Sequence, residues 1–315
     1  MSAHAAFDTA PFLEATTGGT ENPTVSWATS GDGVRVRIGD YGRGTRGTVL
    51  CFPGRTEYIE KYMHVARKFR EAGYGFVAID WRGQGLADKL IDDTALGHVE
   101  RFSDYQHDVD AMVAYATSAN LPRPWHLVAH SMGGAIGLRA LARGLDVQSA
   151  AFSAPMWDLT ISKPVRPIAR VIPRLAEATG FSKAMVPGTG RGSYVMTASP
   201  DDNKLTNDPN TFLWFQGHVK AHPELGLSGP TMRWLTEAFR EFDDYARMPA
   251  PDVPCRAYVG TEERIVSPQR IHDLANKWPT LSLMELPGAQ HEIFMEAPAV
   301  RDKALTDMVE FFQTH

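Results

Sequence analysis

The residues of this sequence that could do chemistry begin with a serine between a short apolar run and a stretch of small residues. Residues 125–130 (Trp-His-Leu-Val-Ala-His) have the pattern of a buried strand, and the residues after Ser131 have helical spacing. A sharp strand-to-helix turn would expose the Ser131 hydroxyl, and small residues two positions away, Ala129 and Gly133, leave room for it. The helix would aim free N–H groups at an oxyanion, the first of them from Met132. The pattern predicts a nucleophilic serine; the alternative is an ordinary turn between a strand and a helix.

A serine hydroxyl is a weak nucleophile at neutral pH, so it needs a general base, which in turn needs an orienting acid. In folds with a serine on such a turn, the acid follows along the chain and the histidine comes last. His291 lies in the Pro-Gly loop after the last predicted strand, 281–286, and is the predicted base. His126 and His130 are too close to Ser131 in sequence to turn back as the base, and we interpret them as structural.

Three carboxylates are candidates for the orienting acid. Glu263, after the predicted strand 255–260, is the preferred one. Glu262 is adjacent, but side chains alternate along an extended chain, so it would point elsewhere. Asp158, after the predicted strand 147–152, is the third candidate.

An oxyanion hole needs a second N–H donor besides that of Met132. The predicted strand 48–52 ends at Pro53-Gly54-Arg55. Gly54 lets the backbone approach closely, and the N–H of Arg55 is the predicted donor. A simple turn at Pro53-Gly54 is the alternative, although this loop leaves a buried strand and enters a helix.

The elements that must position these residues alternate between strands and helices. This order predicts an α/β fold with a mostly parallel central sheet and helices on both faces. In such sheets ligands bind outside the carboxyl ends of the strands, where all the candidate residues fall. The predicted strands are 34–38 (alternating, hence a half-exposed edge strand), 48–52, 76–80, 125–130, 147–152, 255–260 and 281–286, with helices at 59–72, 102–119 and 299–312.

The alternation breaks between residues 156 and 248, where prolines are frequent and strand patterns vanish. About 90 residues without strands are too many for a loop, so this stretch is predicted to be an inserted helical cap, or lid. The predicted organisation is a flexible N-terminal arm (1–24), a first core part (25–155), the cap (156–248) and a second core part (249–315).

Composition excludes several classes of protein. The net charge of −5 gives no general attraction to nucleic acid, and two cysteines, Cys51 and Cys255, make neither a disulfide framework nor a metal site. Residues 1–20 lack the pattern of a Sec-type signal peptide, and no run approaches about 18 apolar residues. We therefore expect a cytoplasmic protein without cofactor or metal. The sequence does not indicate the oligomeric state.

One charged stretch lies within the predicted cap. Arg166, Arg170 and Arg174 recur every four residues beside apolar positions, which is typical of a basic amphipathic helix on an anionic membrane. The alternative is a solvated face of the cap, broken by Pro167 and Pro173. The first interpretation predicts peripheral contact with the inner face of the membrane.

Several segments of this chain carry motifs that are found together in one family. They are 53–62 (Pro-Gly-Arg-Thr-Glu-Tyr-Ile-Glu-Lys-Tyr), 80–85 (Asp-Trp-Arg-Gly-Gln-Gly), 98–108, 129–134, 260–266 and 288–292. With them, the chain from residue 48 onward resembles α/β-hydrolases of the lysophospholipase and monoacylglycerol lipase branch, which includes S33-type serine hydrolases. The resemblance is weak only in the cap. It implies a serine hydrolase that cleaves carboxylic esters of lipids with one acyl chain, through a Ser131–His291–Glu263 (or Asp158) triad and an acyl-enzyme.

The chain departs from the family pattern at three places. Ala129 stands where the family usually has glycine, Glu263 where it usually has aspartate, and Pro53 where histidine often precedes Gly54. Alternative functions for a protein with this fold are those of a small-ester esterase, a proline-iminopeptidase-like aminopeptidase and a non-catalytic ligand-binding protein. Dehalogenases and epoxide hydrolases are disfavoured because they use aspartate in place of Ser131.

Overall fold

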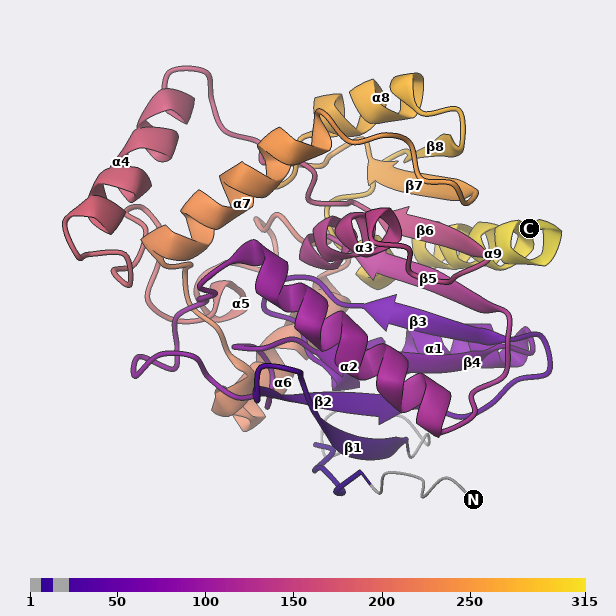
Figure 1. The fold of residues 1–315 in the computed structure, drawn as a ribbon. Coiled ribbons are helices and arrows are strands. Elements are labelled where there is room, and N and C mark those ends of the chain that lie inside the picture. The colour runs from indigo at the N-terminus through magenta and orange to yellow at the C-terminus, as the bar shows by residue number, and fades with distance from the viewer. Residues whose placement is uncertain (1–6, 14–22) are drawn as a thin grey trace.

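The computed structural model describes residues 7–13 and 23–315, and these residues are built around one eight-stranded sheet (Figure 1). The strand order is β1-β2-β4-β3-β5-β6-β7-β8; β2 pairs antiparallel with β1 and β4, and all other pairs are parallel. The predicted α/β fold is therefore confirmed. The strands are β1 Thr24–Thr29, β2 Arg35–Asp40, β3 Thr48–Phe52, β4 Gly75–Asp80, β5 Trp125–His130, β6 Ser149–Ser153, β7 Cys255–Gly260 and β8 Leu281–Leu286.

The predicted edge strand at 34–38 is not at the edge. β1 takes the edge and covers β2, whose residues Val36, Arg37 and Ile38 are all fully buried. The alternation was misleading because Arg37 reads as a solvent-facing residue, whereas its guanidinium is paired inside the protein with Glu60 and Asp80. Of the predicted N-terminal arm 1–24, residues 1–6 and 14–22 lie outside the described residues.

Helices cover both faces of the sheet (Figure 1). α2 and α3 lie on one face, and α1 and α9 lie on the other. The predicted helix 59–72 begins as a short 3-10 turn, η2 Ile59–Tyr62, and the predicted helix 102–119 begins with η3 Phe102–Asp104. The helices of this part are α1 Met63–Glu71, α2 Tyr105–Ser118, α3 Met132–Ala142, α8 Pro268–Lys277 and α9 Pro298–Thr314.

The chain between β6 and β7 contains helices but none of the eight strands. Its helices α4, α5 and α6 lie on the side toward which the parallel strands point (Figure 1), and α4 packs against α7. This places the predicted cap segment beside the carboxyl ends of the strands. The helices are α4 Arg166–Ala178, α5 Tyr194–Thr197, α6 Pro209–Ala221, η4 Pro223–Leu225 and α7 Met232–Tyr245.

Two of the three arginines of α4 are paired with carboxylates and do not form a free basic face. Arg166 pairs with Asp158, and Arg170 makes two hydrogen bonds to Asp243 on α7. Pro167 and Pro173 do not break the helix either, because Pro167 lies in its first turn and Pro173 is accommodated inside a continuous α4. Four apolar side chains of α4 are exposed to solvent: Ile168, Val171, Ile172 and Leu175 are between 41% and 59% exposed.

No helix among residues 7–13 and 23–315 combines the length and apolarity needed to cross a membrane.

Candidate active site

Ser131 lies on the sharp turn between β5 and α3. Its backbone angles are φ 49° and ψ −115°, in a region that residues with a side chain rarely adopt. The turn is held by the neighbouring strand, since the Ser131 N–H donates to the carbonyl of Ser153 at 3.0 Å and its own carbonyl accepts from Met156 at 2.8 Å. A strained backbone fixed in this way sets the direction of the Ser131 hydroxyl.

The small residues around the turn are explained by crowding. A Cβ atom at Gly133 would lie 2.0 Å from the carbonyl oxygen of Phe52, so only glycine fits there. Ala129, which replaces the usual glycine on the other side, is completely buried in β5. The single methyl group of Ala129 is therefore accommodated within the sheet.

The structure brings Ser131, His291 and Glu263 together. The Ser131 hydroxyl lies 2.9 Å from Nε2 of His291, and Nδ1 of His291 lies 2.7 Å from Oε2 of Glu263. The other oxygen of Glu263 accepts from the backbone N–H groups of Ile265 (2.6 Å) and Val266 (3.1 Å). The extra methylene of Glu263, compared with aspartate, does not prevent its contact with the imidazole.

The two alternative acids lie elsewhere. Asp158 binds Arg166, and it accepts the backbone N–H of Leu159 at 2.8 Å. Glu262 accepts from the side-chain amide of Asn207 at 2.8 Å. In this structure it is Glu263 that contacts His291, as the alternation argument predicts for the pair Glu262 and Glu263.

Burial and charge act in opposite directions on the two titrating partners. Burial alone would lower the pKa of His291, but Glu263 beside it, with Glu292 and Glu57 further away, raises the pKa above the ordinary 6.5. Burial would raise the pKa of Glu263, but His291 and the two backbone N–H donors lower it below the ordinary 4.5. The arrangement thus favours a charged carboxylate next to a protonated imidazole, the state formed when His291 takes a proton from Ser131.

The loop after β3 approaches the serine closely. A Cβ atom on Gly54 would lie 3.2 Å from Cβ of Ser131, so the residue just before Arg55 lies directly beside the serine. The N–H of Met132 is in the first turn of α3, where backbone N–H groups lack an acceptor within the helix. Both predicted oxyanion donors therefore belong to segments that meet at Ser131.

The sequence alone did not assign the residues that hold this loop. Gln84 donates to the carbonyl of Gly54 at 3.1 Å and accepts from the N–H of Thr56 at 3.0 Å. Trp81 donates to the carbonyl of Pro53 at 2.9 Å. Both residues lie in the Asp-Trp-Arg-Gly-Gln-Gly segment, so the signal was present as a motif, but its contact with the 53–56 loop depends on the tertiary structure.

Two histidines near Ser131 lie apart from its hydroxyl. Nδ1 of His126 lies 2.9 Å from the hydroxyl of Ser149, and its ring stacks on Phe312. Nδ1 of His130 lies 3.0 Å from the carbonyl of Ser153. The structure thus places both rings in packing and hydrogen-bonding positions, as we interpret them from the sequence.

Known proteins are similar to this chain over most of its length. Residues 43–298, which are most of the chain, match the family described as serine aminopeptidase, S33. The chain belongs to this family. Lysophospholipase L2 of Escherichia coli K12 is 33% identical to this S33-family chain over 283 residues, which are 86% of this chain and 81% of that protein.

More distant proteins share the same fold. A monoacylglycerol lipase of Mycolicibacterium smegmatis is 24% identical over 276 residues, covering 86% of this chain and 89% of that protein. The solved structure of a soluble variant of monoglyceride lipase from Saccharomyces cerevisiae superimposes with a TM-score of 0.72 at 20% identity, covering 97% of this chain and 98% of that one. These likenesses confirm the α/β-hydrolase fold of the S33-family chain.

We predict that kcat/KM for ester hydrolysis falls as the pH drops through the pKa of His291. The base must be neutral to accept the serine proton, so protonation in acid removes activity. Glu263, Glu292 and Glu57 raise this pKa. The acidic limb of the pH–rate profile, in which the rate falls as the pH is lowered, should therefore have its midpoint above pH 6.5. A pH profile of kcat/KM measures the midpoint, and a value clearly below 6.5 would contradict the proposed environment of the base.

A second prediction distinguishes the candidate acids. Glu263→Gln should lower kcat by about 10²- to 10⁴-fold, because a neutral amide cannot stabilise the imidazolium that forms at His291. Asp158→Asn, at a carboxylate that binds Arg166 instead, should change kcat by less than about tenfold. Steady-state kinetics of the two variants, with far-UV circular dichroism to verify folding, make the comparison; a larger loss in Asp158→Asn would reverse the assignment.

Proposed function

We propose that this chain is a serine hydrolase that cleaves carboxylic esters of lipids with a single acyl chain, a lysophospholipid or a monoacylglycerol. The observation that carries the proposal is the hydrogen-bonded series Ser131–His291–Glu263 at the strained turn. The names of the related lysophospholipase and monoacylglycerol lipase support the choice of ester and lipid. Ser131, His291 and Glu263 are the proposed nucleophile, base and orienting acid.

The geometry supports a two-step acyl transfer. Oγ of Ser131 attacks the acyl carbonyl carbon while its proton passes to Nε2 of His291, and the N–H groups of Arg55 and Met132 bind the oxyanion. Protonated His291 gives the proton to the leaving alcohol as the carbon–oxygen bond breaks. Water, deprotonated by His291, then attacks the acyl carbon; the bond from this carbon to Oγ of Ser131 breaks, His291 returns the proton to Oγ, and the fatty acid is released. Glu263 holds the imidazole with Nε2 toward the serine throughout.

One alternative activity is favoured by a specific observation. The matching family is described as serine aminopeptidase, so cleavage of an aminoacyl amide by the same residues is the second candidate function. A small-ester esterase would also use the same residues, because the serine chemistry does not depend on the length of the acyl chain. These activities differ in the substrate that reaches Ser131, so substrate comparison separates them.

We predict that Ser131→Ala abolishes hydrolysis, with a loss of at least about 10⁴-fold, because no other group can form the acyl-enzyme. The wild-type protein should cleave lysophosphatidylcholine or monoacylglycerol with a higher kcat/KM than acetyl esters or aminoacyl amides. The panel should contain p-nitrophenyl esters of graded chain length, both lipids and an aminoacyl amide. Retained turnover in Ser131→Ala would contradict the serine assignment, and a preference for the amide would replace the lipid substrate.

The exposed side of α4 suggests how the protein meets a lipid surface. Since Arg166 and Arg170 are paired with carboxylates, the contact would be made by the exposed apolar residues of the same helix. Burying exposed isoleucine and leucine side chains in an acyl phase contributes about 1.5–3 kcal/mol each when burial is complete. We therefore propose peripheral membrane contact through the apolar side of α4, made by Ile168, Val171, Ile172 and Leu175.

This contact predicts vesicle binding that depends little on salt. The double substitution Ile168→Ser with Leu175→Ser should reduce flotation with anionic vesicles at least fivefold, at both low and high salt. Leu213→Ser is the matched control, because Leu213 is equally exposed (53%) but lies on α6, away from α4 in Figure 1. If the wild-type protein does not float at low salt, or the double variant floats equally well, α4 is not the contact surface.

A further inference from the structure

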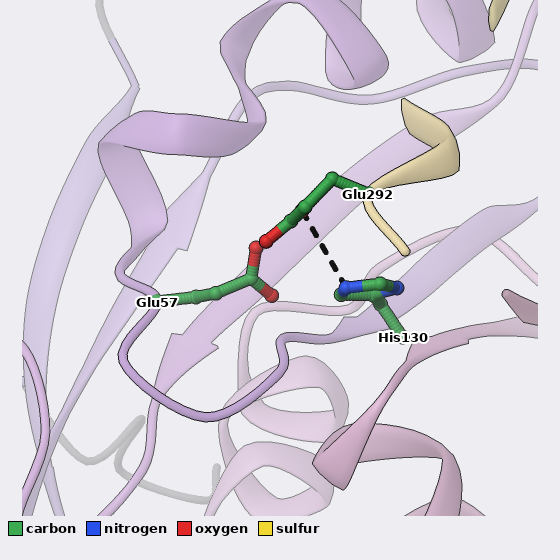
Figure 2. Close-up of side chains that lie close together, drawn as sticks. All are labelled: Glu57, His130 and Glu292. Carbon is green, nitrogen blue, oxygen red and sulfur yellow. Dashed lines mark ion pairs between the residues drawn. The ribbon is translucent and has the colours of Figure 1, made fainter. Parts of the chain in front are cut away.

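A cluster of buried side chains lies directly behind the proposed catalytic residues. It consists of Glu57, Lys61, His130 and Glu292, all buried. Nζ of Lys61 donates to Oε1 of Glu57 at 2.5 Å and to Oε1 of Glu292 at 2.8 Å, so one ammonium group joins two carboxylates. Figure 2 shows these two carboxylates pointing toward each other with the His130 ring beside them, and Nε2 of His130 lies 3.5 Å from Oε2 of Glu292.

Three members of the cluster, Glu57, His130 and Glu292, each belong to a different catalytic segment. Glu57 is two residues beyond Arg55 in the loop of the proposed oxyanion donor. His130 immediately precedes the nucleophile, and Glu292 immediately follows the base. Lys61, from η2, therefore connects the oxyanion loop with the loop of the catalytic histidine through two ion pairs.

Glu57 also holds the oxyanion loop directly. Its second oxygen accepts the backbone N–H of Gly54 and the hydroxyl of Tyr62, the latter at 2.6 Å. Because Gly54 immediately precedes Arg55, this contact fixes the peptide that leads to the proposed donor N–H. An oxyanion donor is effective only when its direction is set before the reaction begins.

The charges within the cluster do not cancel. Burial lowers the pKa of His130 although Glu57 and Glu292 oppose this, which favours the uncharged ring. Two carboxylates and one ammonium then leave a net charge of −1 in the interior. Buried ion pairs are often replaceable by apolar residues without loss of stability, so folding alone does not explain this arrangement.

The net negative charge lies close to the catalytic base. The centroids of the His130 and His291 rings are 4.9 Å apart. Burial opposes a charge on His291, whereas Glu263 foremost, then Glu292 and Glu57, favour it. The cluster thus acts in the same direction as Glu263 on the imidazolium that forms when Ser131 attacks.

We propose that Glu57, Lys61 and Glu292 are positioning residues that fix the oxyanion loop against the histidine loop and place a net negative charge behind protonated His291. This inference rests on the proposed function, since it assumes that Ser131 and His291 react. The cation that joins the two carboxylates is the Lys61 ammonium.

The test measures inactivation by a fluorophosphonate reagent between pH 5 and pH 9. Oγ of Ser131 forms a bond to phosphorus, fluoride leaves with its bonding electrons, and His291 takes the serine proton. The rate therefore reports on the serine and its base whatever the natural substrate is. A failure of the lipid panel alone leaves this test intact, whereas a wild-type protein that does not react at Ser131 would overturn both the proposed function and this inference.

Substitutions of opposite sign should move the acidic limb of the rate in opposite directions. Lys61→Met leaves two unopposed carboxylates and should move the limb up by about 0.5–1 pH unit, while Glu292→Gln removes one carboxylate and should move it down by a similar amount. The double variant Lys61→Met with Glu57→Gln restores the net charge of −1, and its limb should return close to that of the wild type. A role in packing alone does not give shifts of opposite sign.

The height of the pH profile tests the positioning of the loop. Glu57→Ala removes the acceptor of the Gly54 N–H and should lower the plateau rate by about 10²-fold, as expected when an oxyanion donor is misplaced. In the Lys61→Met with Glu57→Gln variant, the glutamine oxygen can still accept this N–H, so the plateau should recover by at least tenfold over Glu57→Ala.

A neighbouring buried ion pair provides the control. Glu60 lies next to Lys61 in η2, but its carboxylate pairs with Arg37. Glu60→Gln should lower the thermal unfolding midpoint and leave the acidic limb in place. The inference is overturned if folded Lys61→Met and Glu292→Gln shift the limb in the same direction or not at all, or if Glu60→Gln shifts it equally. Should Lys61→Met not fold, the downward shift in Glu292→Gln decides by itself.

Discussion

The strained turn at Ser131 is the constraint on which the rest of the site depends. A non-glycine residue at φ 49° and ψ −115° costs on the order of 1–3 kcal/mol, so the surrounding structure must hold it. Three strands do so: β5 delivers the serine, β6 binds its N–H through Ser153, and β3 leaves space only for Gly133. The nucleophile is therefore fixed by the centre of the sheet, where side chains are fully buried and backbone positions are least free to shift.

The order of the strands explains how distant residues meet at this turn. β5, β6, β7 and β8 are consecutive neighbours and all parallel, so their carboxyl ends share one edge. Glu263 and His291 follow β7 and β8 and reach back across this edge to Ser131. Both carboxylate oxygens of Glu263 are used. Oε1 accepts hydrogen bonds from the backbone N–H groups of residues 265 and 266, while Oε2 contacts His291.

Two buried clusters of charged residues include neighbouring residues of η2 but contact different parts of the protein. Arg37, Glu60 and Asp80 form ion pairs that join β2, η2 and the end of β4. Lys61, the next residue after Glu60, points instead to Glu57 and Glu292 beside the catalytic loops. Of the two adjacent residues in η2, Glu60 thus pairs with a charge in the sheet, and Lys61 pairs with charges beside the catalytic loops. This explains why the short segment between β3 and α1 carries so many charges in the protein interior.

The sequence by itself determined the local features: the apolar runs of the central strands, the serine with small neighbours, and the order serine, acid, histidine. These follow from hydrophobic periodicity and from turn chemistry, which act over a few residues. Only the tertiary structure decided which acid contacts His291, that Arg37 is buried rather than exposed, that Arg170 of α4 is paired with Asp243, and that Glu57 and Glu292 share Lys61. Each of these depends on contacts between segments tens to hundreds of residues apart, and a charged side chain has the same local signature whether it meets water or a buried partner.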